Sequence, residues 1–136
     1  MTVARPMNVF DIAGRAMSAQ LVRLNTTASN LANAGSVSST KEGAFRALKP
    51  VFETVSGGPG IATVGVSQVV QSDVEPVKLH SPGNPLADAN GDVWQAGVDT
   101  SAELIDMVES ARQYQNNVQV LQTAKTLTLD TLRLGQ

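Results

Sequence analysis

Two heptad-spaced runs of apolar residues, one at each end of the chain, constrain its fold more than any other feature of the sequence. Apolar or small residues recur at alternating steps of four and three from Phe10 to Leu31, and the same steps run from Leu104 to Leu121. This spacing places one stripe along an α-helix and is typical of helices that pack against another helix. The stripes comprise Phe10, Gly14, Met17, Leu21, Leu24, Ala28 and Leu31, and Leu104, Met107, Ala111, Tyr114, Val118 and Leu121. The sequence therefore predicts long terminal helices packed as a coiled-coil-like pair.

The ends of both helices carry residues that favour helix termini. Asn8 is a candidate N-cap of a first helix from Val9 to Ala34, with Asp11 completing a capping box, and Gly35 is a candidate stop. Asp99 or Thr100 is expected to cap the second helix.

The apolar stripe of the second helix changes register near its end. It stops at Lys125, and a second stripe continues one residue out of phase. That stripe comprises Val120, Ala124, Leu127, Thr131 and Leu134. Because the stripe rotates around the helix, we expect the far end of the helix to face a different neighbour.

The middle of the chain has the composition of strands rather than helices. The runs Ala44 to Val55 and Ile61 to Gln71 are rich in β-forming residues, and the loop Ser56 to Gly60 between them predicts a β-hairpin. In the second run, alternation places Val64, Val66 and Val70 on one face and Ser67 and Gln71 on the other.

An extended arm is expected to follow the hairpin. The segment Glu75 to Gly91 contains three prolines and two glycines, which predicts irregular backbone, and Asn90-Gly91 predicts a turn before Val93 and Trp94. The fold class is therefore α+β, mainly α. We divide the chain into an N-terminal helix (1–36), a β-rich insert with an extended arm (37–97) and a C-terminal helix (98–136).

The sequence contains no convincing catalytic, cofactor or metal site. Cysteine is absent, which excludes thiol catalysis, and the single histidine, His80, is interpreted as structural or exposed. Glu103, Asp106 and Glu109 are assigned to the helix dipole, because they fall near the start of the second helix. Asp88, Asn90 and Asp92 resemble a calcium loop, but Gly91 is not at the position that such a loop requires, so a turn is predicted.

Composition also limits the partners. A net charge of −2 without a basic cluster argues against nucleic acid as a partner, and no small-molecule substrate is indicated. No apolar run has the length of a membrane span, and Asp11, Gly14 and Arg15 interrupt the place where a signal peptide would be apolar.

Both predicted helices have faces that are polar but almost without charge. Arg23 is the only charged residue from position 20 to 33, and Lys125 is the only one from 113 to 129. Amides and hydroxyls can be buried against protein without an ionic desolvation cost if they are hydrogen-bonded. We therefore expect Asn30 and Gln119 to be exposed in the monomer and buried at contacts between subunits.

Several stretches resemble the flagellar axial proteins, and among them the proteins of the proximal rod. The resemblance is carried by Asn8 to Gly14, Arg23 to Ala34, Phe45 to Phe52, Ser81 to Gly91, Glu103 to Lys125 and the ending Leu134-Gly135-Gln136. It implies a non-enzymatic structural subunit without cofactors that polymerises through its terminal helices. The implied subunit-packing residues are Phe10, Met17, Leu21, Leu24, Ala28, Asn30, Leu31, Leu104, Met107, Ala111, Tyr114, Val118, Gln119, Leu121, Leu127 and Leu134.

The resemblance also implies a location and partners. The location would be the periplasmic rod of the flagellar basal body, reached through the flagellar type III export apparatus without a cleaved signal peptide. The partners would be other rod proteins, further copies of this chain, the adaptor at the rod base and the membrane-ring protein. The alternative is a soluble helical binding module or an export chaperone, which would not form filaments.

Overall fold

The computed structural model describes residues 7–136 and contains two long helices and five strands. In chain order these are α1 (Val9–Asn33), β1 (Val37–Ser38), β2 (Leu48–Gly58), β3 (Ile61–Gln71), β4 (Val77–His80), β5 (Asp92–Gln95) and α2 (Thr100–Leu134). The first six residues of the predicted N-terminal segment lie outside this description. The predicted order of a helix, a β-rich insert and a helix is therefore confirmed.

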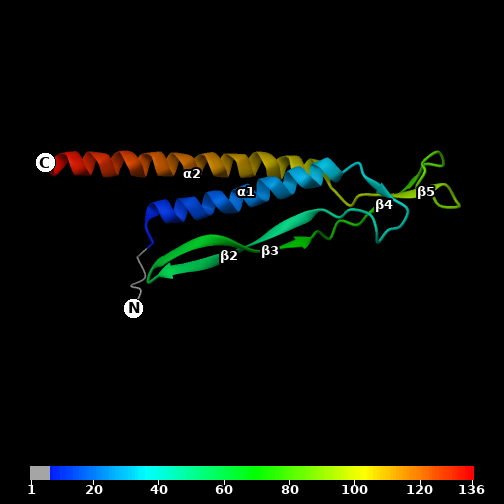
Figure 1. Ribbon diagram of the computed structural model, residues 1–136, viewed down its shortest axis with the longest axis horizontal. Helices are drawn as coiled ribbons and strands as arrows, with labels where there is room; N and C mark the ends of the chain where they lie inside the picture. The colour runs from blue at the N-terminus through cyan, green and yellow to red at the C-terminus, as the bar shows by residue number, and fades with distance from the viewer. Residues whose placement is uncertain (1–6) are drawn as a thin grey trace.

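The molecule is elongated, with its two helices antiparallel and side by side (Figure 1). The β2–β3 ribbon lies along the other side of α1, and the small sheet of β1, β4 and β5 lies at one end. At about 1.5 Å per residue, the 35 residues of α2 extend about 52 Å. The 25 residues of α1 are fewer, so the C-terminal part of α2 continues past the start of α1.

Helix capping follows the sequence prediction at the start of both helices. The side chain of Asn8 accepts a hydrogen bond from the backbone N–H of Asp11, and the Asp11 side chain accepts one from Asn8, each at 3.0 Å. Asp99 caps α2 by accepting from Ala102 at 3.1 Å. Gly35 directly follows the C-cap Ala34, at the place where the stop was predicted, but its φ is not positive, so it does not form a left-handed glycine cap.

The predicted stripes account for only part of the burial in the helices. On α1 the buried residues are Ala13, Ala19, Thr27 and Asn30. Met17, Leu24 and Leu31 are half-buried, whereas Phe10 and Leu21 remain 40% and 44% exposed. A heptad stripe describes one contact face, but α1 lies between α2 and the ribbon and contacts both. The residues buried at these contacts are small or polar.

The least exposed stripe of α2 includes polar residues that a search for apolar spacing overlooks. Its members are Glu103, Met107, Ser110, Tyr114, Asn117, Leu121 and Ala124, again at steps of four and three. The predicted stripe shares Met107, Tyr114 and Leu121 with it, but Leu104 is 51% exposed. The heptad spacing predicted for α2 therefore agrees with the structure. The stripe of least exposed residues is rotated slightly around the helix axis from the predicted stripe.

The hairpin is confirmed with adjusted ends. Strand β2 begins at Leu48 and continues to Gly58, and β3 has the predicted bounds. The two strands are antiparallel, with Gly58 and Gly60 at positive φ in the tight turn. Ser67 has no paired residue on β2, because the register shifts between Val51 and Phe52. This bulge interrupts the alternation on which the predicted common face of Val64, Val66 and Val70 depended.

The predicted irregular arm contains a strand. Residues Val77–His80 form β4, which pairs antiparallel with β5, and the sheet order is β1-β5-β4. The partner lies about fifteen residues further along the chain, so local composition did not reveal the pairing. The predicted turn is confirmed: Gly91 has a φ of 79°, and Asp88 accepts hydrogen bonds from the backbone of Asn90 and Asp92.

Gly97 allows two parts of the backbone to meet just before α2. A Cβ at this position would overlap the carbonyl oxygen of Val74 and lie 3.0 Å from the nitrogen of Pro76. Because these are backbone atoms, Gly97→Ala is expected to lower the free energy of unfolding by about 1–3 kcal/mol. Thermal unfolding followed by fluorescence of Trp94, the only tryptophan, measures this. Gly35→Ala is the control, since nothing lies within 4 Å of its Cβ; equal stability of the two variants would contradict the prediction.

Candidate assembly surfaces and the polar cluster behind them

A buried asparagine joins α1 to both the ribbon and α2. Asn30 is fully buried, and its amide donates to the backbone oxygen of Leu48 at 2.8 Å while its oxygen accepts from the Leu48 N–H at 2.8 Å. The same amide nitrogen donates to Glu103 at 3.0 Å. One side chain therefore satisfies backbone groups at the first residue of β2 and a carboxylate on α2.

Two cations complete a polar cluster with Asn30 and Glu103. The Glu103 side chain is 2% exposed, and its second oxygen accepts from the Lys49 ammonium at 2.6 Å. Lys49 also donates to Asp106 at 2.9 Å, and Asp106 accepts from Arg23 at 3.3 Å. The cluster of Arg23, Asn30, Lys49, Glu103 and Asp106 thus joins α1, β2 and α2, three segments that are far apart in the sequence.

The charges in the cluster alter the titration of its members. Burial opposes ionisation of Asp106, but hydrogen bonds and charges from Lys49 and Arg23 outweigh it and hold the pKa of Asp106 below its usual 3.8. Burial likewise opposes the charge on Lys49, but Glu103 and Asp106 outweigh it and raise the pKa of Lys49 above 10.5. The stabilisation from Asp106 is therefore lost as pH falls through its lowered pKa, and that from Lys49 is lost as pH rises through its raised pKa.

Asp106→Asn tests this pH dependence. At pH 7 the variant is expected to be less stable than the parent chain by about 1 kcal/mol, because it lacks the charge that faces Lys49 and Arg23. The difference should shrink as pH falls below 3.8, since the parent Asp106 then becomes protonated too. Urea unfolding at a series of pH values measures the difference. A difference that stays constant into acid would contradict the assignment.

The cluster corrects two sequence predictions. Asn30 was expected to be exposed in the monomer, but it is buried within the chain by Leu48 and Glu103. Glu103 and Asp106 were assigned to the helix dipole, yet their side chains form ion pairs with Lys49. Glu109 lies 4.0 Å from Arg23. For Asn30 the only local signal was the small number of charged residues around it. For Glu103 there was none, because its partners are 54 and 73 residues away in the sequence.

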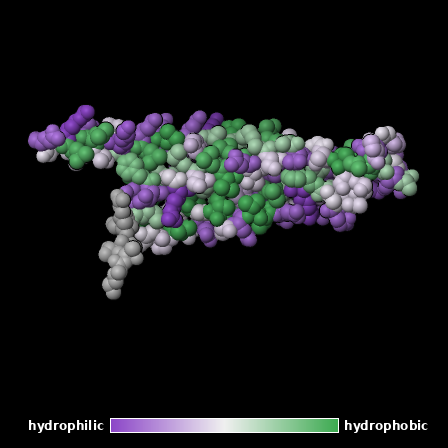
Figure 2. All heavy atoms as spheres, in the orientation of Figure 1, coloured by the Kyte–Doolittle hydropathy of each residue, from purple (hydrophilic) through white to green (hydrophobic). Residues whose placement is uncertain are grey.

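A shallow apolar groove lies where α2 passes the first turn of α1. It has a volume of about 700 Å³ and is lined by Val9 and by seven residues of α2: Asn116, Gln119, Val120, Thr123, Ala124, Leu127 and Thr128. Leu127 is 62% exposed, and Leu134 beyond it is 87% exposed. Leu104, Ile105 and Val108 form a second exposed apolar patch near the start of α2. Figure 2 shows how hydrophobic side chains remain at the surface along the molecule.

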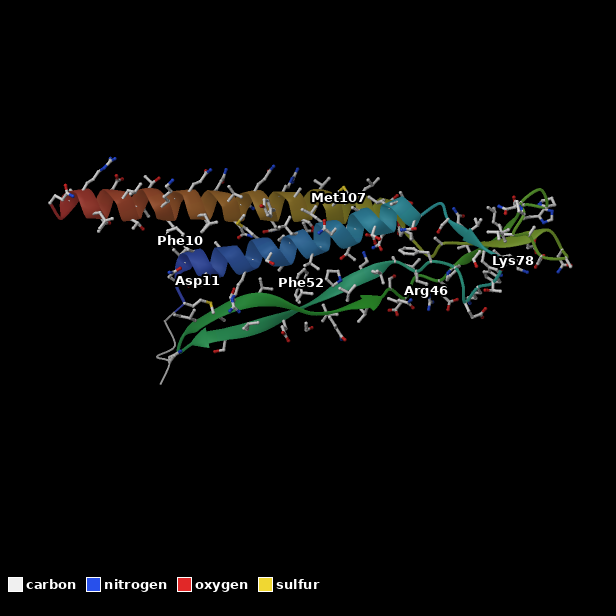
Figure 3. The ribbon with its side chains drawn as sticks, in the orientation of Figure 1. Phe10, Asp11, Arg46, Phe52, Lys78 and Met107 are labelled. Atoms are coloured by element: carbon white, nitrogen blue, oxygen red, sulfur yellow. The ribbon has the colours of Figure 1, made fainter. Side chains whose placement is uncertain are left out.

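Apart from the buried Asn30, the predicted packing residues divide into two groups in this chain. Half-buried between elements of the same chain are Met17, Leu24, Leu31, Met107, Ala111, Tyr114, Val118 and Leu121. Exposed to solvent are Phe10, Leu21, Ala28, Leu104, Gln119, Leu127 and Leu134. Figure 3 shows Phe10 at the start of α1 and Met107 on α2 where the helices run together. Only the second group is free to meet another subunit without rearrangement.

The other candidate site residues from the sequence are His80 and the acidic residues of the turn before β5. His80 is exposed, with Nδ1 2.8 Å from Asp92, whose pKa is lowered chiefly by this hydrogen bond. Among residues 7–136, no three acidic, cysteine or histidine side chains gather as a metal site would require. Within the same range, no helix combines the length and apolar character needed to cross a membrane.

Comparison with known proteins decides the family. Residues 10–35 match the family model described as flagella basal body rod protein, and residues 89–134 match that of the flagellar basal body rod FlgEFG protein C-terminal. The flagellar basal-body rod protein FlgC of Salmonella typhimurium is 47% identical over 132 residues, which cover 96% of this chain and 98% of the relative. The FlgC of Yersinia enterocolitica is 46% identical with the same coverage. The chain belongs to the FlgC family of flagellar basal-body rod proteins.

Membership of the FlgC family confirms the class of function. The chain is a structural subunit of the flagellar basal-body rod and not an enzyme. The two matched segments coincide with α1 and with β5 and α2, so the family models describe the helical pair and the strand that leads into it. The long β2–β3 ribbon lies outside both matches.

Proposed function

We propose that this FlgC-family subunit polymerises in the proximal rod through the exposed parts of its two terminal helices. Support comes from the groove around Leu127 and from the C-terminal part of α2, which continues past α1 with Leu129, Leu132 and Leu134 exposed. In an isolated monomer this apolar surface stays in water and does not contribute to stability, whereas a neighbouring helix would bury it. The expected gain is about 25 cal/mol per Å² of apolar surface buried.

The exposed members of the predicted packing set are the proposed contacts between subunits. These are Phe10, Leu21, Ala28, Leu104, Gln119, Leu127 and Leu134. Coiled-coil-like packing is proposed for the α1–α2 pair within the chain and for its continuation by helices of neighbours. Gln119 lies in the groove, and its amide can be buried there if a neighbour supplies a hydrogen-bond partner.

The division into helical core (1–36 and 98–136) and β-rich insert (37–97) is retained as a proposal about roles. The helical core would build the torque-transmitting shaft, and the insert would decide which neighbours fit. Proposed partners are other rod proteins, further copies of this chain, the rod-base adaptor and the membrane-ring protein. Export through the flagellar type III apparatus to a periplasmic rod is part of the same proposal.

The sheet formed by β1, β4 and β5 provides a test of the role of the insert. Lys78 on β4 is 49% exposed, and Val77 and Leu79 beside it are 62% and 46% exposed. With Lys78→Cys carrying a thiol-attached photocrosslinker, we expect crosslinks to a different rod protein in intact basal bodies. The parent chain has no cysteine and serves as the unlabelled control. Crosslinks confined to the same chain would exclude this surface as a docking site.

A further inference from the structure

The β2–β3 ribbon leaves both of its long edges without a strand partner in the described part of the chain. Each strand has eleven residues, which extend about 36 Å, and the sheet they form contains only these two strands. Helix α1 contacts both strands, and its Asn30 occupies the backbone N–H and C=O of Leu48 at the start of β2. Beyond Leu48, no strand of residues 7–136 pairs with the outer edge of β2 or of β3. A two-stranded ribbon is marginal in water, and a free edge presents unpaired backbone donors and acceptors.

The β3 edge lacks the features that normally prevent strand pairing. Among its eleven residues there is no charged residue and no proline. The edge strand β4 differs, because Lys78 places a charge within its four residues. Val69 on β3 is 46% exposed, and Phe52 on β2 is 36% exposed. Free backbone groups in an uncharged β-forming segment specify the chemistry of an occupant, which is another extended strand.

Resting on the rod assembly proposed above, we propose that the β3 edge of one copy pairs with the β2 edge of the next copy and forms a sheet that continues between subunits. Strands β2 and β3 are antiparallel within a chain, so ribbons placed side by side in one orientation bring β3 and the next β2 together as antiparallel neighbours. Pairing of β3 with β3 would instead be two-fold and would close after two copies.

The sequence of β2 is compatible with pairing to β3 of a neighbouring copy over most of its length. Pro50 lacks a backbone N–H, so the edge is weakened near the start of the strand. Lys49 is directed to Glu103 and Asp106 on α2 and is not available to protect the edge. From Val51 to Gly58, Glu53 is the only charged residue. The pairing is therefore expected along the distal part of the ribbon.

Disulfide or short thiol crosslinking between two tagged copies tests the pairing in basal bodies. One copy carries Glu53→Cys or Thr54→Cys on β2, and the other carries Ala62→Cys or Gln68→Cys on β3, all at exposed positions. These combinations sample several registers, and the parent chain contributes no thiol. We expect a covalent dimer of the two tags for at least one combination. Adding Ala62→Lys to the copy with Gln68→Cys should abolish the dimer, while Ala62→Thr should preserve it.

The outcomes separate the pairing from rod membership. Three results would overturn the pairing while the chain is still found in basal bodies: no β2–β3 dimer, dimers only between two β3 cysteines, or crosslinks only to other proteins. Each of these results would leave the assignment as a rod subunit intact. Absence of the parent chain from basal bodies would overturn both. Unchanged Trp94 fluorescence and thermal midpoint in the Ala62 variants exclude a folding defect as the cause of lost dimers.

Discussion

Replacement of Lys49 by methionine is expected to lower the free energy of unfolding by about 3 kcal/mol at pH 7. The reason is Glu103, whose side chain is 2% exposed and loses its nearest cation, 2.6 Å away. Asn30 still donates to the carboxylate, but an amide does not neutralise its charge. Urea unfolding followed by Trp94 fluorescence measures the change.

A second substitution distinguishes the loss of charge balance from a general packing defect. In Lys49→Met/Glu103→Gln the buried charge is removed as well, so most of the lost stability should return. Lys78→Met is the control, because the 3.4 Å ion pair of Lys78 with Asp92 is at the surface, and the change should be within about 0.5 kcal/mol. Equal losses for Lys49→Met and the double variant would contradict the charge explanation.

Leu127→Asp is expected to abolish incorporation into the rod without destabilising the monomer. Leu127 is 62% exposed, so an aspartate there is solvated in the free chain and should change its stability by no more than about 0.5 kcal/mol. In the proposed assembly the same carboxylate would be buried in the groove without a cation, which is strongly unfavourable. The measurements are the amount of variant in purified basal bodies, the swimming of the cells and the thermal midpoint of the isolated chain.

Lys125→Asp is the matched control for Leu127→Asp. Lys125 lies two residues away on the same helix, is exposed, does not line the groove and already carries a charge. It should assemble and support motility. Normal incorporation of Leu127→Asp would exclude the groove as a contact between subunits. Equal loss of both variants would show that a negative charge anywhere on this segment prevents assembly.

Local sequence patterns were sufficient to predict the two long helices and the hairpin between them. The capping residues Asn8 and Asp99 set the helix starts, and the glycine-rich turn separated the two long strands. These signals involve residues within a few positions of one another. The strand β4 was missed for two reasons. Its partner β5 follows only after a turn-rich segment, and prolines flank its own four residues on both sides.

The polar cluster shows what local patterns could not reveal. Glu103 near the start of a helix is well explained by the dipole, and nothing nearby in the sequence indicates that Lys49 and Asn30 reach it. Asn30 was recognised as unusual for a helix surface, but the sequence could not distinguish burial inside the chain from burial against another subunit. Exposure of Leu127 and Gln119 in the free chain, in contrast, agrees with their predicted availability for assembly.

Quantitative mass spectrometry of purified basal bodies most directly tests the central claim that this chain is a structural rod subunit. The chain should be present in a fixed ratio to the other rod proteins and should remain after washing that removes soluble proteins, and cells lacking it should have no rod beyond its position. An export chaperone or soluble binding module would instead stay in the soluble fraction. Absence of the chain from washed basal bodies of swimming cells would contradict the claim.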